Sequence, residues 1–454
     1  MVYLPLICAE VVFIGSVILY MFGPIEWSGS QNIKLISLLL SYFIAFAIGY
    51  IYVFKMKSKD ELYTENTSSL NDVILKYSWV VFSLSIIASL ILHRNLTHSD
   101  SYIPYTLFKD FYMGVFESFE VRQFYASGAF ADKFNGNPLV SSLLLFLSVF
   151  KYITPVVLVS FWDKFKLKYK ILGIVSLLLP VMSSICITVN AVIINLLITL
   201  GIVFFFQLLK NRKNILSYLK VRKLLIFIII SLSAFMTFYF YLIKSGVSVD
   251  VALQERSRVD QFKFLENDDI KIKKHKFSNS YSWFLNDYYV KLSAYVTSGY
   301  QGMNYALSQK FTSSFGAGHS IFIQRNLDKF LNLGLRERTY PYKSSQKWHE
   351  YEKWHSAYTY FANDVSFYGV IGVMFLFGYL LASTIKVFLL KECVISLSLT
   401  SLLVLQIFYM SANNQIFALL EYLTSFWILL LLFSFRDKIK NNILVRLSFS
   451  RNRA

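Results

Sequence analysis

The chain has 454 residues, of which 56% are hydrophobic and only 16% are charged. A soluble protein of this length carries about a quarter charged residues, so the composition excludes an ordinary water-soluble globular class. The formal net charge is +18, but the basic residues gather in short segments between apolar blocks. That placement is typical of cytoplasmic loops and argues against a nucleic-acid partner. The composition therefore predicts a polytopic membrane protein.

Apolar blocks long enough to cross a hydrocarbon core recur along the chain, and about ten membrane-spanning helices are expected. The predicted spans are 2–22, 33–54, 77–93, 138–162, 171–190, 191–209, 224–243, 366–390, 394–411 and 416–435. Only Pro180, Ser183, Ser184 and Asn190 mark a turn between the fifth span and the sixth. We therefore expect an all-α fold in which residues 1–454 form a single integral membrane domain.

The short basic segments set the predicted orientation. Lys and Arg are concentrated in segments 55–76, 163–170 and 210–223 and in a basic tail, 436–454. With ten spans, all four fall on one side of the membrane, and Lys- and Arg-rich loops face the cytoplasm. Both termini are therefore expected in the cytoplasm.

Two longer segments are expected on the opposite, outer face, at 94–137 and 244–365. The second separates the predicted seventh and eighth spans and holds no apolar run long enough to cross a membrane. It is rich in Tyr, Trp and Phe and contains four of the six histidines. Disordered linkers lack aromatic residues, and long loops in compact proteins are usually functional. We therefore expect a large, mostly helical cap.

The end of this cap reads WHEYEKWHSAYTYFANDVSFYGVIGV, at 348–373. A zinc-protease HExxH motif would need a second histidine where Lys353 stands. His349 and His355 are six positions apart and would lie on different faces of a helix. No metal site and no cofactor are therefore expected.

His355 could instead act as a general base without a metal. It forms a polar stripe with Thr359 and Asn363 at helical spacing, and Asp364 lies next to that stripe. A histidine that titrates near neutrality at the membrane boundary could accept a proton from a sugar hydroxyl. The alternative is an interfacial histidine in an aromatic belt that includes Trp354. The residues by themselves favour this second interpretation.

Arginines of the two outer segments form a third pattern. The candidates are Arg122, Arg256, Arg258, Arg325, Arg336 and Arg338. A guanidinium group is permanently charged and can donate two parallel hydrogen bonds to the oxygens of a phosphate. A solvated surface role is the simpler interpretation for any one of them, whereas the group predicts an anion-binding site.

Glycines form a further pattern, which is read first as a packing signal. Turns or close approaches are expected at Gly299, Gly302, Gly316 and Gly318, and close helix contact in the predicted eighth span at Gly369, Gly372 and Gly378.

Three stretches, taken with this architecture, carry a family resemblance. ERSR at 255–258 follows the predicted seventh span, YVTSGYQGMNYAL at 295–307 lies in the middle of the cap, and HSAYTYFANDVSFYGVIGV at 355–373 leads into a glycine-bearing helix. The chain resembles the bacterial repeat-unit polymerases of O-antigen and capsule synthesis and their relatives, the O-antigen ligases. It departs from the family pattern in the competing arginines and in the spacing of Asp364 and Gly369.

The resemblance implies a protein of the bacterial inner (cytoplasmic) membrane that carries out metal-independent glycosyl transfer. The transfer would take place at the periplasmic face, where segments 94–137 and 244–365 would lie. The donor would be a growing glycan on undecaprenyl pyrophosphate, and the acceptor a single lipid-linked repeat unit. His355 would be the catalytic base, and the candidate arginines, Asp364 and Tyr300 would bind the pyrophosphate or the glycan. Expected partners are undecaprenyl-pyrophosphate-linked oligosaccharides, membrane lipids and a chain-length regulator protein, with no nucleic acid.

Three other functions stay open at this point. An O-antigen ligase would use the same apparatus to transfer glycan to lipid A core. A metal-dependent glycosyltransferase would need paired acidic residues, for which Asp100 and Asp110 are the candidates. A flippase or other transporter would place ionisable residues inside the spans, where Glu10 and Glu421 are found.

Overall fold

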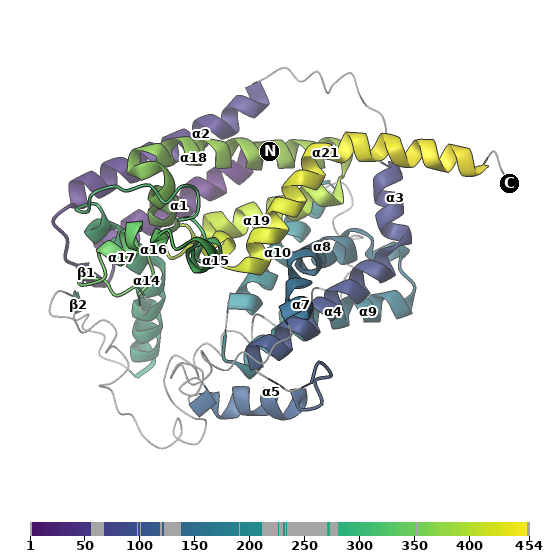
Figure 1. Cartoon of the computed structure of the whole chain (residues 1–454), viewed down its shortest axis with the longest axis horizontal. Coiled ribbons are helices and arrows are strands. Elements are labelled where there is room, and N and C mark those ends of the chain that lie inside the picture. Colours follow the sequence, from purple (N-terminus) through teal and green to yellow (C-terminus); the bar gives the residue numbers. More distant parts are fainter. Residues whose placement is uncertain are drawn as a thin grey trace. The chain divides into compact units, whose positions relative to one another are not determined.

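The computed structural model of the chain is shown in Figure 1. It describes residues 2–55, 68–97, 99, 101–118, 120–121, 138–189, 191–210, 226, 230–231, 233, 270–272, 280–350 and 353–451. Almost all of the predicted seventh span lies outside the described residues, as do Arg122, Arg256 and Arg258. The chain forms two compact units. The first consists of Met1–Ser58, Val259–Lys386 and Leu403–Leu423, and the second of Lys59–Arg258, Val387–Leu402 and Thr424–Ala454.

Six described helices are long and apolar enough to cross a membrane. They are α1 (Leu4–Phe22), α2 (Asn32–Lys55), α4 (Ser78–Thr97), α9 (Leu167–Cys186), α10 (Ala191–Lys210) and α18 (Ala357–Lys391). Two shorter apolar helices are α8 (Leu144–Ser160) and α19 (Val394–Tyr409). These helices support the predicted helical membrane protein, because about twenty apolar residues cross a bilayer. The count of ten spans, the orientation and the identity of the membrane stay predictions.

Helix breaks occur both where they were expected and where they were not. α9 ends at Cys186 and α10 begins at Ala191, with Thr188 between them in the left-handed region at φ 56°, so the predicted division of the fifth and sixth spans is confirmed. The predicted fourth span is divided between α7 (Pro138–Ser142) and α8. α18 begins before its predicted start and is interrupted at Ser366, where φ is 65° and ψ is 166°.

The remaining helices are shorter or more polar. They are α3 (Ser68–Lys76), α5 (Leu107–Phe116), the 3-10 turn η2 (Trp162–Lys164), α14 (Ser280–Ala306), α15 (Ile321–Leu331), α16 (Leu335–Arg338), α17 (Tyr340–Lys343), α20 (Gln415–Ala418) and α21 (Leu420–Arg451). Four of these helices, α14 to α17, lie in the segment for which a helical cap was expected.

The first unit also contains a two-stranded sheet, which the all-α prediction did not include. β1 (Ile25–Trp27) pairs with β2 (Ile270–Ile272) in antiparallel register, with Glu26 opposite Lys271. Strands of three residues are too short to show an alternating apolar pattern in sequence. The pairing joins the segment just after α1 to the first third of the long 244–365 segment.

Aromatic and polar contacts join α14 to α1 in the first unit. Tyr300 is fully buried, and its hydroxyl lies 2.8 Å from the Ser16 hydroxyl. One turn further along α1, the Tyr20 hydroxyl donates to Gln301 at 2.9 Å. These bonds satisfy polar groups that would be costly to bury alone. They fix the face that α14 turns towards α1.

Helices α2 and α18 approach each other closely through a pair of glycines (Figure 1). A Cβ atom added at Gly378 would overlap the carbonyl oxygen of Phe46, and one added at Gly49 would overlap that of Phe375. Small residues at helix contacts let two backbones approach, as expected for Gly378. Gly372, by contrast, has no heavy atom within 4 Å of the position of an added Cβ.

The second unit is built around α4, α8 and α9, with α5 packed on α9 and α10 on α8. Ala88 and Ile91 of α4 form a buried cluster with Leu144 of α8. Leu107 of α5 packs with Leu179 and Cys186 of α9. This apolar packing is the kind expected of adjacent membrane helices.

Candidate functional site

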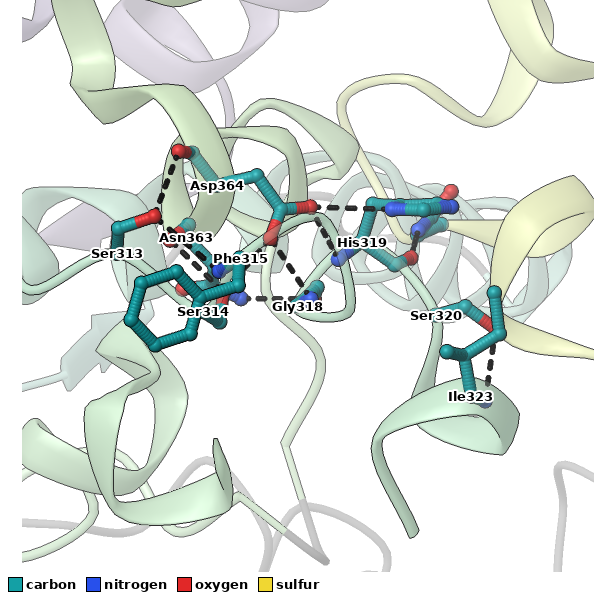
Figure 2. A network of polar contacts seen from close by, with 10 residues as sticks. Ser313, Ser314, Phe315, Gly318, His319, Ser320, Ile323, Asn363 and Asp364 are labelled. Carbon is teal, nitrogen blue, oxygen red and sulfur yellow. Dashed lines mark hydrogen bonds and ion pairs between the residues drawn. The ribbon is translucent and has the colours of Figure 1, made fainter. Parts of the chain in front are cut away.

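A short loop, residues 311–320, is fastened to α18 by the side chain of Asp364 (Figure 2). The carboxylate accepts hydrogen bonds from Ser314 Oγ at 2.7 Å and from the backbone N–H groups of Gly318 and His319 at 2.9 Å each. It also lies 3.0 Å from Nδ1 of His319. The two oxygens of a carboxylate can accept about four hydrogen bonds, so these contacts occupy its acceptor positions.

Asn363, the neighbour of Asp364, holds the same loop through both its side chain and its backbone. Its Nδ2 donates to the carbonyl of Gly318 at 3.0 Å, and its carbonyl accepts from the N–H of Ser314 at 3.0 Å. Its Oδ1 accepts from the N–H of Tyr340, at the start of α17, at 2.8 Å. Two consecutive residues of α18 therefore determine the shape of the loop.

The loop sequence FTSSFGAGHS suits this tight path. Phe315 and Gly316 both have positive φ values, 55° and 82°, which make the turn. At Gly318, an added Cβ would overlap the side chains of Ser314 and Asn363. Glycine is the residue that permits such a close approach of backbone and side chains. The turn then carries the chain directly to His319.

His319 is positioned as an oriented base. An ionised carboxylate can only accept hydrogen bonds, so Nδ1 of His319 is assigned as the donor to Asp364, and in the neutral form of the ring Nε2 is then an acceptor. The His319 ring packs edge-on against Phe417, with centroids 5.9 Å apart, and its carbonyl accepts from Asn414 Nδ2 at 2.5 Å. The His319 and Asp364 side chains are 19% and 10% exposed. A base held by a third group in this way is the arrangement used in nucleophile activation and proton abstraction.

Cationic side chains gather beside the loop. Arg338 donates to the carbonyl of Ser313 at 3.4 Å, and its guanidinium lies 4.9 Å from the centroid of the Phe315 ring. The ammonium of Lys343 donates to the carbonyl of Lys310 and to the Thr312 hydroxyl, both at 2.9 Å. Burial, together with the charges of Arg338 and Lys310, lowers the pKa of Lys343. Mutual repulsion of this kind favours an anionic ligand.

Two further predicted arginines line a separate small pocket. Arg325 of α15 and Arg336 of α16 border a cavity of about 60 Å³ that also reaches Asn363. Arg336 is already paired with Glu350, through Nε at 3.0 Å and through Nη2. The three candidate arginines that the structure describes are therefore not gathered into one cluster. The structure places Arg338 at the loop, and Arg325 and Arg336 at the pocket.

His355 is sealed inside the protein. Its side chain is fully buried, next to the backbone of Gly302 and close to Trp348. Burial lowers the pKa of His355 to about 3, a shift that the neighbouring Gly302 backbone only partly opposes. The expectation that this histidine titrates near neutrality at a boundary with water is therefore wrong. Its role as catalytic base stays a prediction, and such a role would need an opening that exposes the ring.

The structure also describes two further residues considered in the sequence, Tyr300 and His349. Tyr300 is buried, stacked on Tyr358 at 6.4 Å between ring centroids. His349 is exposed, whereas His355 is buried, so the two histidines lie in different surroundings. Within the part of the chain that the structure describes, no three His, Cys, Asp or Glu side chains are grouped to hold a metal ion.

Sequence reasoning missed His319. In the stretch SFGAGHS, at 314–320, the glycines predict a turn or a close approach, and the histidine was given no role. The partner, Asp364, was selected, but as a substrate-binding residue beside the His355 stripe. The two residues are 45 positions apart in sequence, and no spacing rule joins a loop histidine to a helix carboxylate at that distance. The only available signal was the presence of a histidine in the long outer segment.

Comparison of the chain with protein-family models, with curated proteins and with solved structures finds no match in any of the three.

Proposed function

We propose that this protein polymerises undecaprenyl-pyrophosphate-linked oligosaccharide repeat units by metal-independent glycosyl transfer at the periplasmic face of the inner membrane. The observation that carries the proposal is the pairing of His319 with Asp364 on a loop bordered by cationic side chains. The same carboxylate lies near the start of α18, a helix long and apolar enough to enter a bilayer. A lipid-linked substrate needs such a combination of polar chemistry and membrane helices.

In the proposed reaction, the substrate groups and the two protein side chains each have one role. The acceptor hydroxyl of one repeat unit attacks the anomeric carbon of the donor glycan, and a new glycosidic C–O bond forms. The bond from that carbon to the pyrophosphate oxygen breaks, and undecaprenyl pyrophosphate leaves with the electron pair. Nε2 of His319 takes the hydroxyl proton, while Asp364 holds the imidazole and stabilises its charged form.

The leaving pyrophosphate needs compensation for its negative charge. Arg338, Lys343 and Lys310 are the cations that the structure places beside the loop. Preorganised positive charge at a leaving group is often the largest catalytic contribution of an enzyme. Arg338 is thus retained from the predicted set, and the two lysines join it. In this proposal His319 takes the base role that the family resemblance implied for His355.

A complementation assay tests the proposal. In a host strain that lacks the gene, the length distribution of the surface polysaccharide is measured after expression of His319→Ala or of His349→Ala, at matched protein levels in the membrane. The proposal predicts single repeat units with His319→Ala and normal polymer with the exposed control His349→Ala. Normal polymer length with His319→Ala would contradict it. Normal length with loss of attachment to lipid A core would indicate a ligase instead.

The same strains distinguish a flippase. If lipid-linked repeat units build up on the periplasmic face of membranes that carry His319→Ala, a polymerase is supported. If they build up on the cytoplasmic face, transport has failed and the glycosyltransferase proposal is overturned.

A further inference from the structure

The pocket between α15, α16, α17 and α18 is not used by the proposed transfer step. It is lined by Arg325, Arg336, Glu350 and Asn363, together with the apolar surfaces of Pro341 and Tyr360. Its polar floor is buried, since Asn363 is 1% exposed, whereas Arg325 and Arg336 are exposed at the surface. The pocket is therefore open to solutes and has a fixed, polar base.

The charge of the pocket points to a ligand with one negative charge. Arg336 is neutralised by Glu350, whose side chain is only 12% exposed, and both of their hydrogen bonds converge on Oε1 of the glutamate. The guanidinium of Arg325 then leaves one net positive charge among the lining groups. A pyrophosphate carries two or more negative charges and is normally held by several cations or backbone N–H groups. A single carboxylate matches this lining better.

The remaining groups suit a sugar. Glu350 and the amide of Gln324 can exchange hydrogen bonds with hydroxyl groups, and Tyr360 offers an aromatic surface beside them. A volume of about 60 Å³ holds a few water-sized groups, because one water needs roughly 10–15 Å³ by the same measure. That space fits the carboxylate-bearing edge of one sugar ring and excludes an oligosaccharide.

The pocket is linked to the candidate site through adjacent residues. Asn363 lines the pocket, and the next residue, Asp364, holds His319. Asn363 also fixes the loop through Gly318 (Figure 2). A sugar bound in the pocket would therefore lie against Asn363, the residue that precedes the carboxylate holding the proposed base.

We propose that this pocket is a subsite for an acidic monosaccharide, of the hexuronic acid type, in the repeat unit. The inference rests on the proposed function for its biological meaning, but it concerns binding and can be tested without turnover. Arg325 would bind the sugar carboxylate, and Glu350 and Gln324 would bind its hydroxyl groups.

The test uses the purified full-length protein in detergent and two small probes, methyl β-D-glucuronide and methyl β-D-glucoside. Binding is measured by ligand-observed NMR titration. The proposal predicts that the glucuronide binds at least about tenfold more tightly than the glucoside, as a charge-assisted pair with Arg325 requires. Arg325→Gln should remove this preference. Lys329→Gln, an exposed cation one turn further along α15, should keep it.

Three results would overturn the subsite. They are equal binding of the two probes, an unchanged preference in Arg325→Gln, and tight binding of inorganic pyrophosphate that competes with the glucuronide. The outcome is separate from that of the proposed function. If the protein prefers the glucuronide but His319→Ala still makes normal polymer, the subsite is supported and the polymerase mechanism fails. If the two probes bind equally but His319→Ala makes only single repeat units, the mechanism is supported and the subsite fails.

Discussion

Nδ1 of His319 lies 3.0 Å from Oδ2 of Asp364, and the backbone N–H of the same histidine donates to the same oxygen at 2.9 Å. The carboxylate therefore fixes both the position of the residue and the direction of its ring. A side chain held twice in this way loses little further freedom when it meets a substrate, which is the advantage of a preorganised base.

Asp364→Asn tests this relationship because it keeps the shape of the side chain and removes the charge. We expect the rate of polymer formation to fall by about a hundredfold, since an oriented base contributes roughly 10²–10⁴. Binding of methyl β-D-glucuronide should be unchanged, because the pocket does not use this carboxylate. The measurements are single-turnover rate and probe affinity on one preparation. A retained rate would remove Asp364 from the mechanism.

The loop geometry makes a second prediction at its glycines. Gly318→Ala should displace the loop, because the added methyl group overlaps Ser314 and Asn363, and activity should fall at least about tenfold as the base moves. Gly316→Asn is the matched control. No heavy atom lies within 4 Å of the Cβ position at Gly316, and asparagine tolerates its φ of 82°. Activity of both variants is compared at equal membrane levels. Equal activity would contradict the proposed role of the loop.

His355 predicts a specific dependence of stability on pH. The pKa of this histidine is about 3 in the folded protein, against its ordinary value of 6.5, because burial disfavours the charged ring. Between these two values the unfolded state binds more protons, so the stability contributed by His355 is full above about pH 6.5 and is lost as pH falls. At about pH 5, the loss is about 2 kcal/mol, at about 1.4 kcal/mol per pH unit.

The measurement is the thermal unfolding midpoint of the detergent-solubilised protein at about pH 7.5 and about pH 5. His355→Gln should lose less stability on acidification than the wild type, because it removes the titrating ring. The exposed control, His349→Gln, should behave as the wild type does. A wild-type pH dependence in His355→Gln would show that the ring is already accessible to protons in the folded state, as the base role assigned to His355 requires.

The contact of α2 and α18 gives a stability prediction that is independent of function. Gly378→Ala should destabilise the protein by about 1–3 kcal/mol, because overpacking forces the backbones apart. Gly372→Ala on the same helix has open space around it and should be neutral or slightly stabilising. The measurement is the thermal unfolding midpoint of each variant, compared with that of the wild type. Equal effects would mean that the close approach of Gly378 to Phe46 does not contribute to stability.

Six of the predicted spans coincide with helices that are long and apolar enough to cross a bilayer. Hydropathy could predict these helices because apolar runs of membrane length have few alternative explanations. The break near Asn190 and the close contact at Gly378 were also visible in the sequence, since both depend on local residue types. The β1–β2 pair was not visible, because strands of three residues carry no periodic signal.

The candidate site was only partly predictable for a different reason. Asp364 could be selected because it follows a polar stripe at the head of an apolar helix. His319 could not be ranked above His355, because burial depends on tertiary packing around Gly302 and Trp348. The structure also places Arg338 at the loop, and Arg325 and Arg336 at the pocket, which their proximity in sequence did not suggest.

The most direct measurement is glycan transfer by the purified full-length protein in proteoliposomes that contain lipid-linked repeat units from the host strain. Release of undecaprenyl pyrophosphate is counted against repeat units joined. We expect one undecaprenyl pyrophosphate to be released for each glycosidic bond formed, and a rate about a hundredfold lower for His319→Ala than for the control His349→Ala. Transfer by His319→Ala at the control rate would contradict the proposed mechanism.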